Sequence, residues 1–327
     1  MAERFTSVKK VLVTDNVSPC CKEALVAGGL EVVQNDKMSK EELMAAVKEY
    51  DALIVRSATK VTAEIIESTD GLKIIGRAGT GVDNIDVAAA SKKNIAVMNT
   101  PTANTVSAAE QTCALFLSLA RHTPAADASM KAGNWDRKKF MGTELYGKTA
   151  VIIGLGHIGR EVAIRLQAFG MKTVGFDALL PAEDTKKFGV DQMPLEELWP
   201  IADYISVHVP LLPATKGMIG GKTFEMCKPG LKVINCARGG IIDNDSLVAA
   251  LESGKCGGAA LDVFINEPPT GVEQTLAQHP KVIACPHLGA STKEAQLRVA
   301  REIADQIVES SQGKSLKGII NGRHIGL

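Results

Sequence analysis

The chain has 327 residues, 45% of them hydrophobic and 23% charged, which suggests about two domains with sizeable cores. Lys plus Arg and Asp plus Glu each number 37, and this balance removes the electrostatic basis for binding nucleic acid or an anionic membrane. The seven cysteines show no Cys-x-x-Cys pair, no His or Cys cluster has metal-ligand spacing, and no stretch could span a bilayer. We therefore expect a cytoplasmic protein with reduced thiols and no metal site.

The first hundred residues alternate short apolar strands with helices. Ser18-Pro19 carries the start signal of the first helix, Ser39 and Glu42 form a capping box before the second, and Thr62 precedes the third. Strands are predicted at 10–14, 31–34, 52–56, 73–76 and 96–98. Five strands that alternate with helices predict a parallel, doubly wound, flavodoxin-like domain.

A second alternation follows Pro101. It opens with a long apolar helix over 104–121, a helix that starts at Pro124 and a basic loop over 134–141. Strands are then predicted at 150–153, 172–176, 204–207, 232–235, 259–263 and 282–284, before a last helix over 293–310. Six strands are the number in a complete Rossmann-type sheet.

The two alternations define the expected domains of an α/β protein. Residues 1–100 and 289–327 are expected to form one discontinuous domain, and residues 101–288 a second domain. Parallel sheets bind ligands at the carboxyl ends of their strands, so we expect a cleft between the two domains.

A glycine-rich turn is the strongest single motif. Gly154, Gly156 and Gly159 follow an apolar strand and open a helix, which suits a tight turn, a close approach of pyrophosphate and close helix packing. Asp177 ends the next strand, where a carboxylate can accept hydrogen bonds from a ribose diol. A negative charge there repels a 2′-phosphate, so the turn predicts NAD rather than NADP. Residues 101–288 are therefore expected to be the NAD-binding domain, and residues 1–100 and 289–327 the substrate-binding domain.

Ionisable side chains follow three consecutive strands of the second alternation: Arg238, Glu267 and His287. These residue types suit hydride transfer from a hydroxyl carbon. His287 would remove the hydroxyl proton, Glu267 would hold the imidazole, and Arg238 would clamp a substrate carboxylate. Asp262 is expected to face the nicotinamide. Each residue has a structural alternative as a strand cap, a turn residue or a solvated loop acid.

Five segments carry a resemblance to a known family: residues 55–62, 76–84, 135–143, 235–240 and 285–294. In these segments, and over nearly its whole length, the chain resembles the D-2-hydroxyacid dehydrogenases, and within them the phosphoglycerate branch of the animal type. The resemblance implies NAD-dependent oxidation of 3-phospho-D-glycerate to 3-phosphohydroxypyruvate, the entry step of the phosphorylated serine route. Animal members are longer, with regulatory domains after this core.

The resemblance also implies contact residues. Those for the cofactor are Thr80, Gly154, Gly156, His157, Ile158, Gly159, Asp177, Val209, Pro210, Cys236, Ala237, Arg238, Asp262, His287, Gly289 and Ala290. Those for the substrate are Arg56, Ser57, Arg77, Ala78, Gly79, Asn104, Arg238 and His287. His157 stands where relatives have Arg, and Val209 where they have Thr, so any contact of Val209 goes through its backbone or is lost.

Three further expectations follow from the resemblance. Family members dimerise through the helical region after residue 100, so we expect a homodimer. A glyoxylate or hydroxypyruvate reductase of the same family would share the catalytic residues, and phosphate-binding charge at Arg56, Arg77 and Lys60 would distinguish the two. A corepressor-like protein that senses NAD would share the same pattern without turnover.

Overall fold

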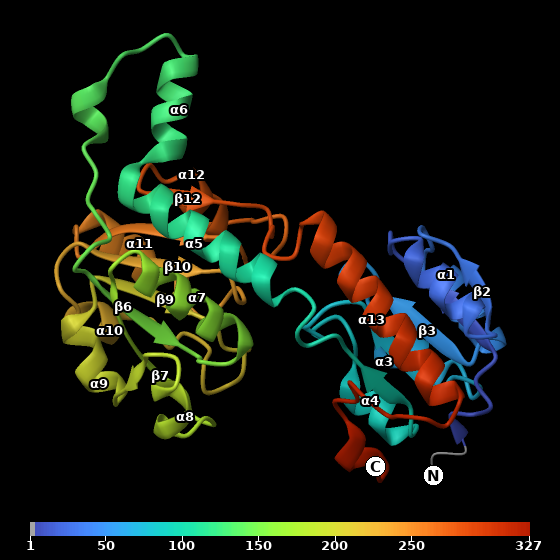
Figure 1. The fold of residues 1–327 in the computed structure, drawn as a ribbon. Coiled ribbons are helices and arrows are strands. Elements are labelled where there is room, and N and C mark those ends of the chain that lie inside the picture. The colour runs from blue at the N-terminus through green and yellow to red at the C-terminus, as the bar shows by residue number, and fades with distance from the viewer. Residues whose placement is uncertain (1–3) are drawn as a thin grey trace. The chain divides into compact units, whose positions relative to one another are not determined.

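The computed structural model describes residues 4–327 and divides into two compact units (Figure 1). The first unit contains the chain up to Asn104 together with Thr292–Leu327, and the second contains Thr105–Ser291. These boundaries fall a few residues beyond the predicted ones at 100/101 and 288/289.

The first unit is built on a five-stranded parallel sheet. Its strands are β1 (Lys10–Val13), β2 (Glu31–Gln34), β3 (Ala52–Val55), β4 (Ile74–Arg77) and β5 (Ala96–Met98). Their order, β2-β1-β3-β4-β5, is that of flavodoxin-like folds. The order reverses between β1 and β3, which makes the loops after these two strands the expected ligand position of this sheet.

Helices cover both faces of this sheet. They are α1 (Cys20–Ala27), α2 (Lys40–Ala46), α3 (Ala63–Glu67), α4 (Val87–Lys92) and α13 (Lys293–Ser311). Successive side chains of a strand point to opposite faces, so Val11 and Val13 pack with α1 and α13, whereas Leu12 packs with α2, α3 and α4. The C-terminal helix α13 thereby belongs to the core of the first unit.

The predicted helix starts are correct in part. The capping box of Ser39 and Glu42 is present at α2, with both reciprocal hydrogen bonds. Two other signals were wrong in detail. Helix α1 begins at Cys20 after Pro19 without a side-chain cap, and Thr62 precedes α3 but its hydroxyl makes no capping bond.

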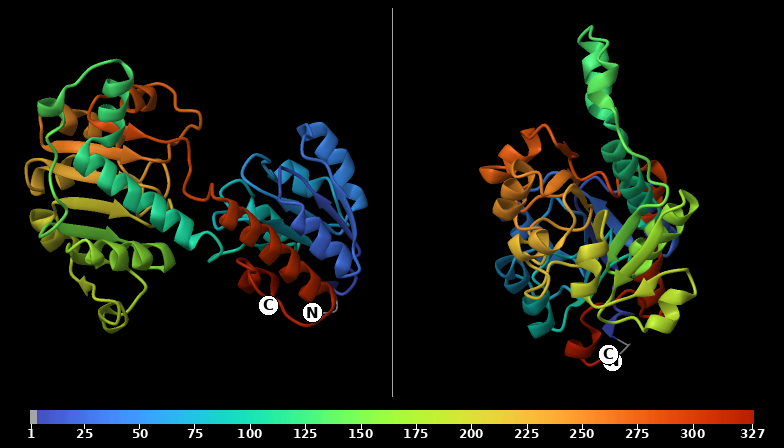
Figure 2. Two further views of the ribbon diagram at one scale, coloured as in Figure 1. Left: turned by 45° about the horizontal axis from the view of Figure 1, so that its top comes forward. Right: turned by 90° about the vertical axis from the view of Figure 1, so that its left-hand side faces the viewer.

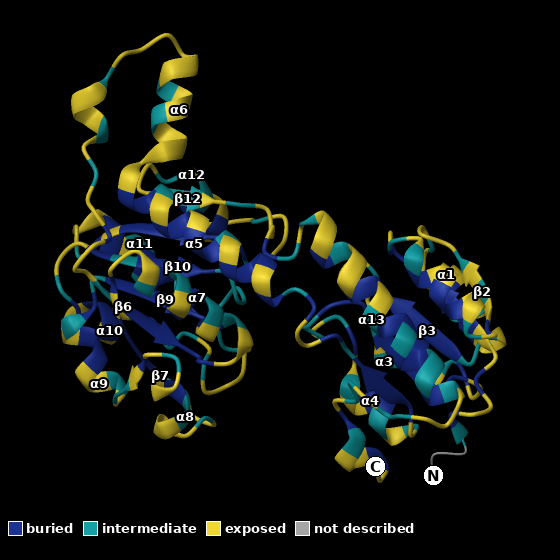
Figure 3. Cartoon of the chain, viewed as in Figure 1, coloured by how far each residue is buried: buried dark blue, intermediate teal, exposed yellow. Residues whose placement is uncertain are grey.

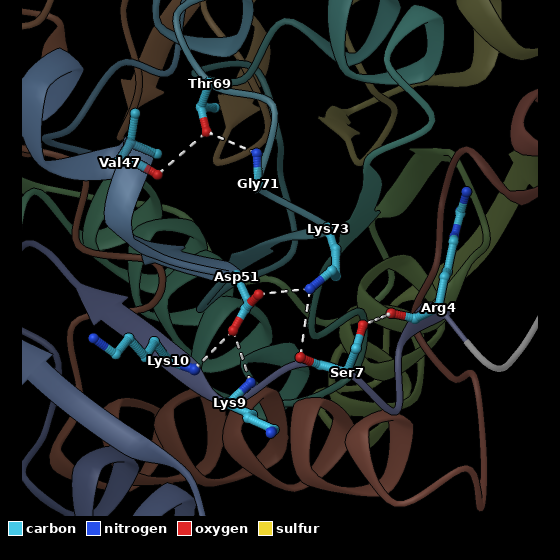
Figure 4. Close-up of polar contacts among 9 residues, drawn as sticks. All are labelled: Arg4, Ser7, Lys9, Lys10, Val47, Asp51, Thr69, Gly71 and Lys73. Carbon is cyan, nitrogen blue, oxygen red and sulfur yellow. Dashed lines mark hydrogen bonds and ion pairs between the residues drawn. The ribbon is translucent and has the colours of Figure 1, made fainter.

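A partly buried ion pair between Asp51 and Lys73 connects the amino ends of β1, β3 and β4 (Figure 4). Asp51 accepts the backbone N–H groups of Lys9 and Lys10 at 2.9 and 3.0 Å through Oδ2, and Lys73 Nζ at 2.6 Å through Oδ1. Burial alone would raise the pKa of Asp51, but the hydrogen bond from Lys73 and the two backbone donors outweigh it, so the pKa is lowered.

The second unit is built on a seven-stranded parallel sheet. Its strands are β6 (Thr149–Ile153), β7 (Lys172–Phe176), β8 (Asp191–Gln192), β9 (Tyr204–Val207), β10 (Leu231–Asn235), β11 (Cys256–Leu261) and β12 (Val282–Ala284). The prediction of six strands was wrong, because the two-residue β8 is too short to leave an apolar run. The order β12-β11-β10-β9-β6-β7-β8 is Rossmann-type, with its reversal between β6 and β9.

Two helices cover one face of this sheet and three cover the other. Helices α5 (Thr105–Arg121) and α7 (His157–Ala168) pack on one face, and α10 (Gly221–Met226), α11 (Asn244–Glu252) and α12 (Val272–Gln278) on the other. The short helices α8 (Ala182–Lys186) and α9 (Leu195–Leu198) link strands β7 to β9. This arrangement is the doubly wound fold expected from the sequence.

An arm leaves the second unit after α5. It consists of α6 (Thr123–Lys131) and the segment that follows, which stands away from the rest of its unit in Figure 2. No residue of α6 is buried, and Figure 3 shows the helix as largely exposed. The expectation of a plain loop over 134–141 was wrong, since Arg137–Phe140 form a 3-10 helix.

We expect Asp51→Asn to lower the free energy of unfolding by on the order of 1–2 kcal/mol at pH 7, because a charge-assisted bond to Lys73 is lost. The pKa of Asp51 is lower in the folded chain than in the unfolded chain, so its contribution is complete above the unfolded value and lost as pH falls through the folded one. Urea unfolding of both proteins between pH 7 and pH 3 should therefore show the difference constant above the unfolded pKa of Asp51 and shrinking as the pH falls below it.

Asp70→Asn is the matched control. Asp70 also pairs with a lysine, Lys93, at 2.8 Å, but its side chain is 99% exposed. Exposed pairs contribute little, so this variant should change stability hardly at all. A difference between wild type and Asp51→Asn that persists unchanged at pH 3 would contradict the assignment to the Asp51 charge.

Candidate active site

The glycine turn between β6 and α7 is built by close backbone approach. Gly154 has φ 89°, and a Cβ there would lie 2.5 Å from the carbonyl oxygen of His208. A Cβ at Gly159 would lie 2.0 Å from the carbonyl oxygen of Gly154. Both positions therefore require glycine to bring α7 and the loop after β9 against the turn.

Gly156 differs from these two glycines. A Cβ at Gly156 would meet no heavy atom within 4 Å, so the space in front of this residue is open. Gly156 is also the N-cap of α7, which has no side-chain cap, and the first N–H groups of a helix have no partner within it. Open space beside uncapped N–H groups fits a pyrophosphate, as the sequence predicts for Gly154, Gly156, His157, Ile158 and Gly159.

Asp177 follows β7 and braces the same turn. Its Oδ2 accepts the backbone N–H of Leu155 at 2.7 Å, and its Oδ1 accepts those of Leu179 and Leu180 at 2.8 and 3.0 Å. A carboxylate oxygen has two lone-pair sites, so Asp177 retains capacity for a ribose hydroxyl. Sequence reasoning missed the bracing role, because Leu155 precedes Asp177 by 22 residues.

His208 follows β9 at the point where the strand order reverses. Its backbone N–H donates to the carbonyl oxygen of Ile153 at 2.7 Å, and its Nε2 lies 2.9 Å from Ser206 Oγ. Burial lowers the pKa of His208 to about 4, so the ring is neutral near neutral pH. Val209 and Pro210, two predicted cofactor contacts, come directly after it, and Val209 Cγ1 borders Gly154.

His287 and Glu267 lie within hydrogen-bond distance of each other. The distance from His287 Nδ1 to Glu267 Oε2 is 2.7 Å, and Glu267 Oε1 accepts the backbone N–H of Phe264 at 3.2 Å. The two side chains are 45% and 40% exposed. A proton on Nδ1 leaves the lone pair of Nε2 available to a ligand, which is the geometry of a His–carboxylate pair.

Asp262 fixes the turn that carries His287. Its Oδ1 and Oδ2 accept the backbone N–H groups of Leu288 and Gly289, each at 2.8 Å, and its carbonyl oxygen accepts that of His287 at 2.9 Å. His287 has φ 56°, a left-handed conformation that such bonds stabilise. Asp262 is fully buried, and burial raises its pKa although the backbone donors act in the opposite direction.

The predicted contact of Asp262 with the nicotinamide remains a prediction. What the structure adds is the role of Asp262 in holding residues 287–289, which the sequence did not indicate. Gly289 and Ala290, two predicted cofactor contacts, lie on this same turn.

The loop after β10 is held by Asn235, a buried residue that sequence reasoning did not select. Asn235 Oδ1 accepts the N–H of Ala237 at 2.9 Å, and its Nδ2 donates to the carbonyl oxygen of Arg238 at 2.8 Å. A Cβ at Gly239 would lie 2.1 Å from the Phe264 carbonyl carbon, so this loop packs on the one after β11. The structure thus places Cys236, Ala237 and Arg238 on a loop that packs against the loop of Glu267.

Two predicted substrate residues, Arg238 and His287, lie in the second unit. In the first unit, Arg56 and Ser57 follow β3, and Arg77, Ala78 and Gly79 lie at the end of β4. Asp15, which follows β1 with φ 62°, accepts the backbone N–H groups of Arg56 and Thr59 at 2.7 and 3.2 Å through Oδ2. Asn84 Nδ2 donates to the carbonyl oxygens of Arg56 and Thr59, each at 2.6 Å. These two residues were not predicted, and they fix the loop of Arg56 and Ser57 at the strand reversal.

The Arg56 guanidinium is partly buried. Its Nη1 donates to Gln296 Oε1, its Nε has no hydrogen-bond partner, and burial lowers its pKa although Asp15 acts in the opposite direction. Arg77 ends β4, and its guanidinium lies against Gly79, next to Ala78.

Thr80 and Asn104 lie together in the same unit. Thr80 Oγ1 donates to Asn104 Oδ1 at 2.6 Å. Thr80, a predicted cofactor contact, is therefore hydrogen-bonded to Asn104, a predicted substrate contact.

Within residues 4–327, no group of three His, Cys, Asp or Glu side chains is placed to hold a metal ion. Among the helices of this described part, none is both long and apolar enough to cross a bilayer. All seven cysteines are free thiols.

Comparison with known proteins identifies relatives of this chain. A family profile for "D-isomer specific 2-hydroxyacid dehydrogenase, NAD binding domain" matches residues 113–289. D-3-phosphoglycerate dehydrogenase of Rattus norvegicus is 57% identical over 319 residues, and that of Bacillus subtilis is 47% identical over 313. The matches cover 98% and 95% of this chain but only 60% and 59% of the relatives, so the chain spans about three fifths of their length.

A solved structure has the same fold. D-lactate dehydrogenase from Aquifex aeolicus, complexed with NAD and lactic acid, superimposes with a TM-score of 0.82 at 30% identity, covering 93% of this chain and 96% of that one. The profile covers the glycine turn, Asp177, the loops of Arg238 and Glu267, and His287. The chain therefore belongs to the D-isomer specific 2-hydroxyacid dehydrogenases, and its second unit contains the NAD-binding domain of that family.

Proposed function

We propose that the chain oxidises 3-phospho-D-glycerate to 3-phosphohydroxypyruvate with NAD, the first step of the phosphorylated route to L-serine. The observation that carries the chemistry is the 2.7 Å contact between His287 Nδ1 and Glu267 Oε2. The substrate is supported by relatives named D-3-phosphoglycerate dehydrogenase, at 57% identity in the rat. Asp177 supports NAD over NADP, because its charge disfavours a 2′-phosphate.

In this proposal His287, Glu267 and Arg238 have direct roles in the reaction, and Asp262 supports His287. Bound NAD supplies the hydride acceptor. Glu267 holds the Nδ1–H of His287, so Nε2 can take the hydroxyl proton, and the Glu267 charge stabilises the imidazolium that forms. Arg238 clamps the substrate carboxylate with parallel N–H donors. The buried Asp262 keeps His287 in its left-handed conformation throughout, because its hydrogen bonds go to the backbone.

At the substrate end, Arg56 and Arg77 provide cations for the phosphate. Arg56 has a buried Nε without a partner, and its loop is fixed by Asp15 and Asn84. A fixed guanidinium matches the geometry of phosphate oxygens better than a flexible ammonium does. Phosphate recognition at this loop would distinguish the proposed substrate from glyoxylate or hydroxypyruvate.

We also propose that the chain is a homodimer in the cytoplasm. The arm exposes large apolar side chains: Met130 at 52%, Trp135 at 74% and Met141 at 80%. Exposed apolar patches are typical of interaction surfaces. The seven free thiols support a reducing compartment.

We expect His287→Ala to lower kcat for 3-phosphoglycerate by about two to four orders of magnitude, the usual share of general acid–base catalysis. The affinity for NAD, measured by calorimetry, should change little. Glu267→Gln keeps the size of the side chain but removes its charge, and should lower kcat less than His287→Ala does. Full activity of His287→Ala would rule out His287 as the base, and an inactive wild-type chain that still binds NAD would favour the corepressor-like alternative.

Arg56→Ala and Arg77→Ala should raise KM for 3-phosphoglycerate much more than KM for the unphosphorylated glycerate, because only the former has a phosphate. Lys40→Ala is the control, since Lys40 is an exposed cation of the same unit that pairs with Glu64. Steady-state assays with both substrates provide the comparison. Equal effects on the two KM values would remove the case for a phosphate site, and glyoxylate turnover above that of phosphoglycerate would favour the reductase alternative.

Trp135→Glu combined with Met141→Glu should convert a dimer to a monomer, because charges replace the most exposed apolar side chains of the arm. Sedimentation velocity of wild type and variant measures this directly. Leu179→Glu, at a residue that is 92% exposed outside the arm, is the control and should leave the mass unchanged. A monomeric wild-type chain would contradict the proposal.

A further inference from the structure

A second group of polar side chains lies at the amino ends of the strands of the second unit. Lys232 of β10 is in register with Tyr204 of β9 and Gly258 of β11. Register partners in a parallel sheet point to the same face, which here is the face covered by α5 and α7. The glycine turn and the loop of His287 follow the carboxyl ends of the strands, so this group is separate from the candidate active site.

Tyr204 contributes a buried hydroxyl without a hydrogen-bond partner. The residue is 2% exposed, and its ring stacks on Phe116 with 5.2 Å between centroids. Burial raises the pKa of Tyr204, and the nearby Thr143 side chain acts in the opposite direction. The hydroxyls of Tyr204 and Thr143 nevertheless lie outside hydrogen-bonding geometry. Buried polar groups in native proteins nearly always have a partner, so this hydroxyl points to a partner that the chain itself does not supply.

Lys232 lies over the ring of Tyr204. Its Nζ is 5.3 Å from the ring centroid and 3.3 Å from Thr143 Oγ1, and no carboxylate of the described residues lies within ion-pair distance of it. Lys228, four residues earlier, pairs with Asp203 at 3.1 Å. The two lysines are both partly buried, yet only Lys228 has an acidic partner.

The surroundings lower the pKa of Lys232, which raises the fraction of neutral amine at a given pH. Burial lowers its pKa most, and the nearby positive charge of Lys148 lowers it further, whereas Asp203 and Cys256 act in the opposite direction. A lysine desolvated next to another cation has the environment of an activated amine nucleophile. Its side chain remains partly exposed, so a reagent from solvent can reach it.

We propose that Lys232 is a modification site whose ε-amine is acylated by small acyl phosphates. The lone pair of Nζ forms a bond to the acyl carbon, the bond from that carbon to the phosphate oxygen breaks, and phosphate leaves with the electron pair. The amine releases a proton to solvent, and no oxidant is needed. Lys148 and the hydroxyls of Tyr204 and Thr143 are the groups available to bind the phosphate beside the amine.

The test is incubation of the whole chain with acetyl phosphate near neutral pH, followed by proteolysis and mass spectrometry. The acetylated fraction of Lys232 should exceed that of Lys228 several-fold. It should also exceed the acetylated fraction of the exposed lysines. Lys228 is the internal control because it is four residues away and equally part of the β10 region. Equal occupancy at the two lysines would overturn the proposal.

A second comparison tests the role of the phosphate. Tyr204→Phe keeps the ring and removes only the unpartnered hydroxyl, so the fold should be retained. With acetyl phosphate, this variant should show a smaller ratio of Lys232 acetylation to Lys228 acetylation than the wild type. With the succinimidyl ester of acetic acid, which has no phosphate, the ratio should be unchanged. The same excess in wild type and Tyr204→Phe with acetyl phosphate would overturn phosphate recognition at this site.

Discussion

The close approach of three backbone segments at the glycine turn is the constraint on which the second unit depends. A Cβ at Gly159 would lie 2.0 Å from the Gly154 carbonyl oxygen, and a Cβ at Gly154 would lie 2.5 Å from the His208 carbonyl oxygen. This contact sets the position of α7 against β6 and of the loop after β9 against the turn. Because the N-terminus of α7 is uncapped and Gly156 faces open space, the same contact leaves donors exposed where a pyrophosphate fits.

Carboxylates that accept backbone N–H groups fix the loops of the candidate site. Asp177 holds the glycine turn, Asp262 holds the turn of His287, and Asp15 holds the loop of Arg56. Each carboxylate follows a strand and reaches a loop distant in sequence, so the sheet and the loops position one another. Hydrogen bonds to charged acceptors are stronger than neutral ones, which suits loops that present catalytic or binding side chains. The rigidity of the site therefore comes from backbone contacts rather than from pairs of surface charges.

Much of this arrangement could be predicted from the sequence. Apolar runs with helix signals between them predicted two parallel sheets, and residues after consecutive strands predicted that Glu267 and His287 would approach each other. The structure places them 2.7 Å apart. The two-residue β8 and the 3-10 helix at Arg137–Phe140 were missed, because such short elements leave no periodic pattern. Asp15, Asn84 and Asn235 were missed for a different reason, since their partners are backbone atoms, which no residue pattern identifies.

Binding of NAD to Gly156→Val is the most direct test of the central claim that the glycine turn receives the pyrophosphate. A Cβ at Gly156 meets no heavy atom within 4 Å, and the backbone of Gly156, at φ −64° and ψ −161°, suits residues other than glycine, so the variant should keep the melting temperature of the wild type. Isothermal titration calorimetry should then show that NAD binding is lost, because the side chain fills the space that the pyrophosphate needs. A folded Gly156→Val variant that binds NAD as tightly as the wild type would contradict the account.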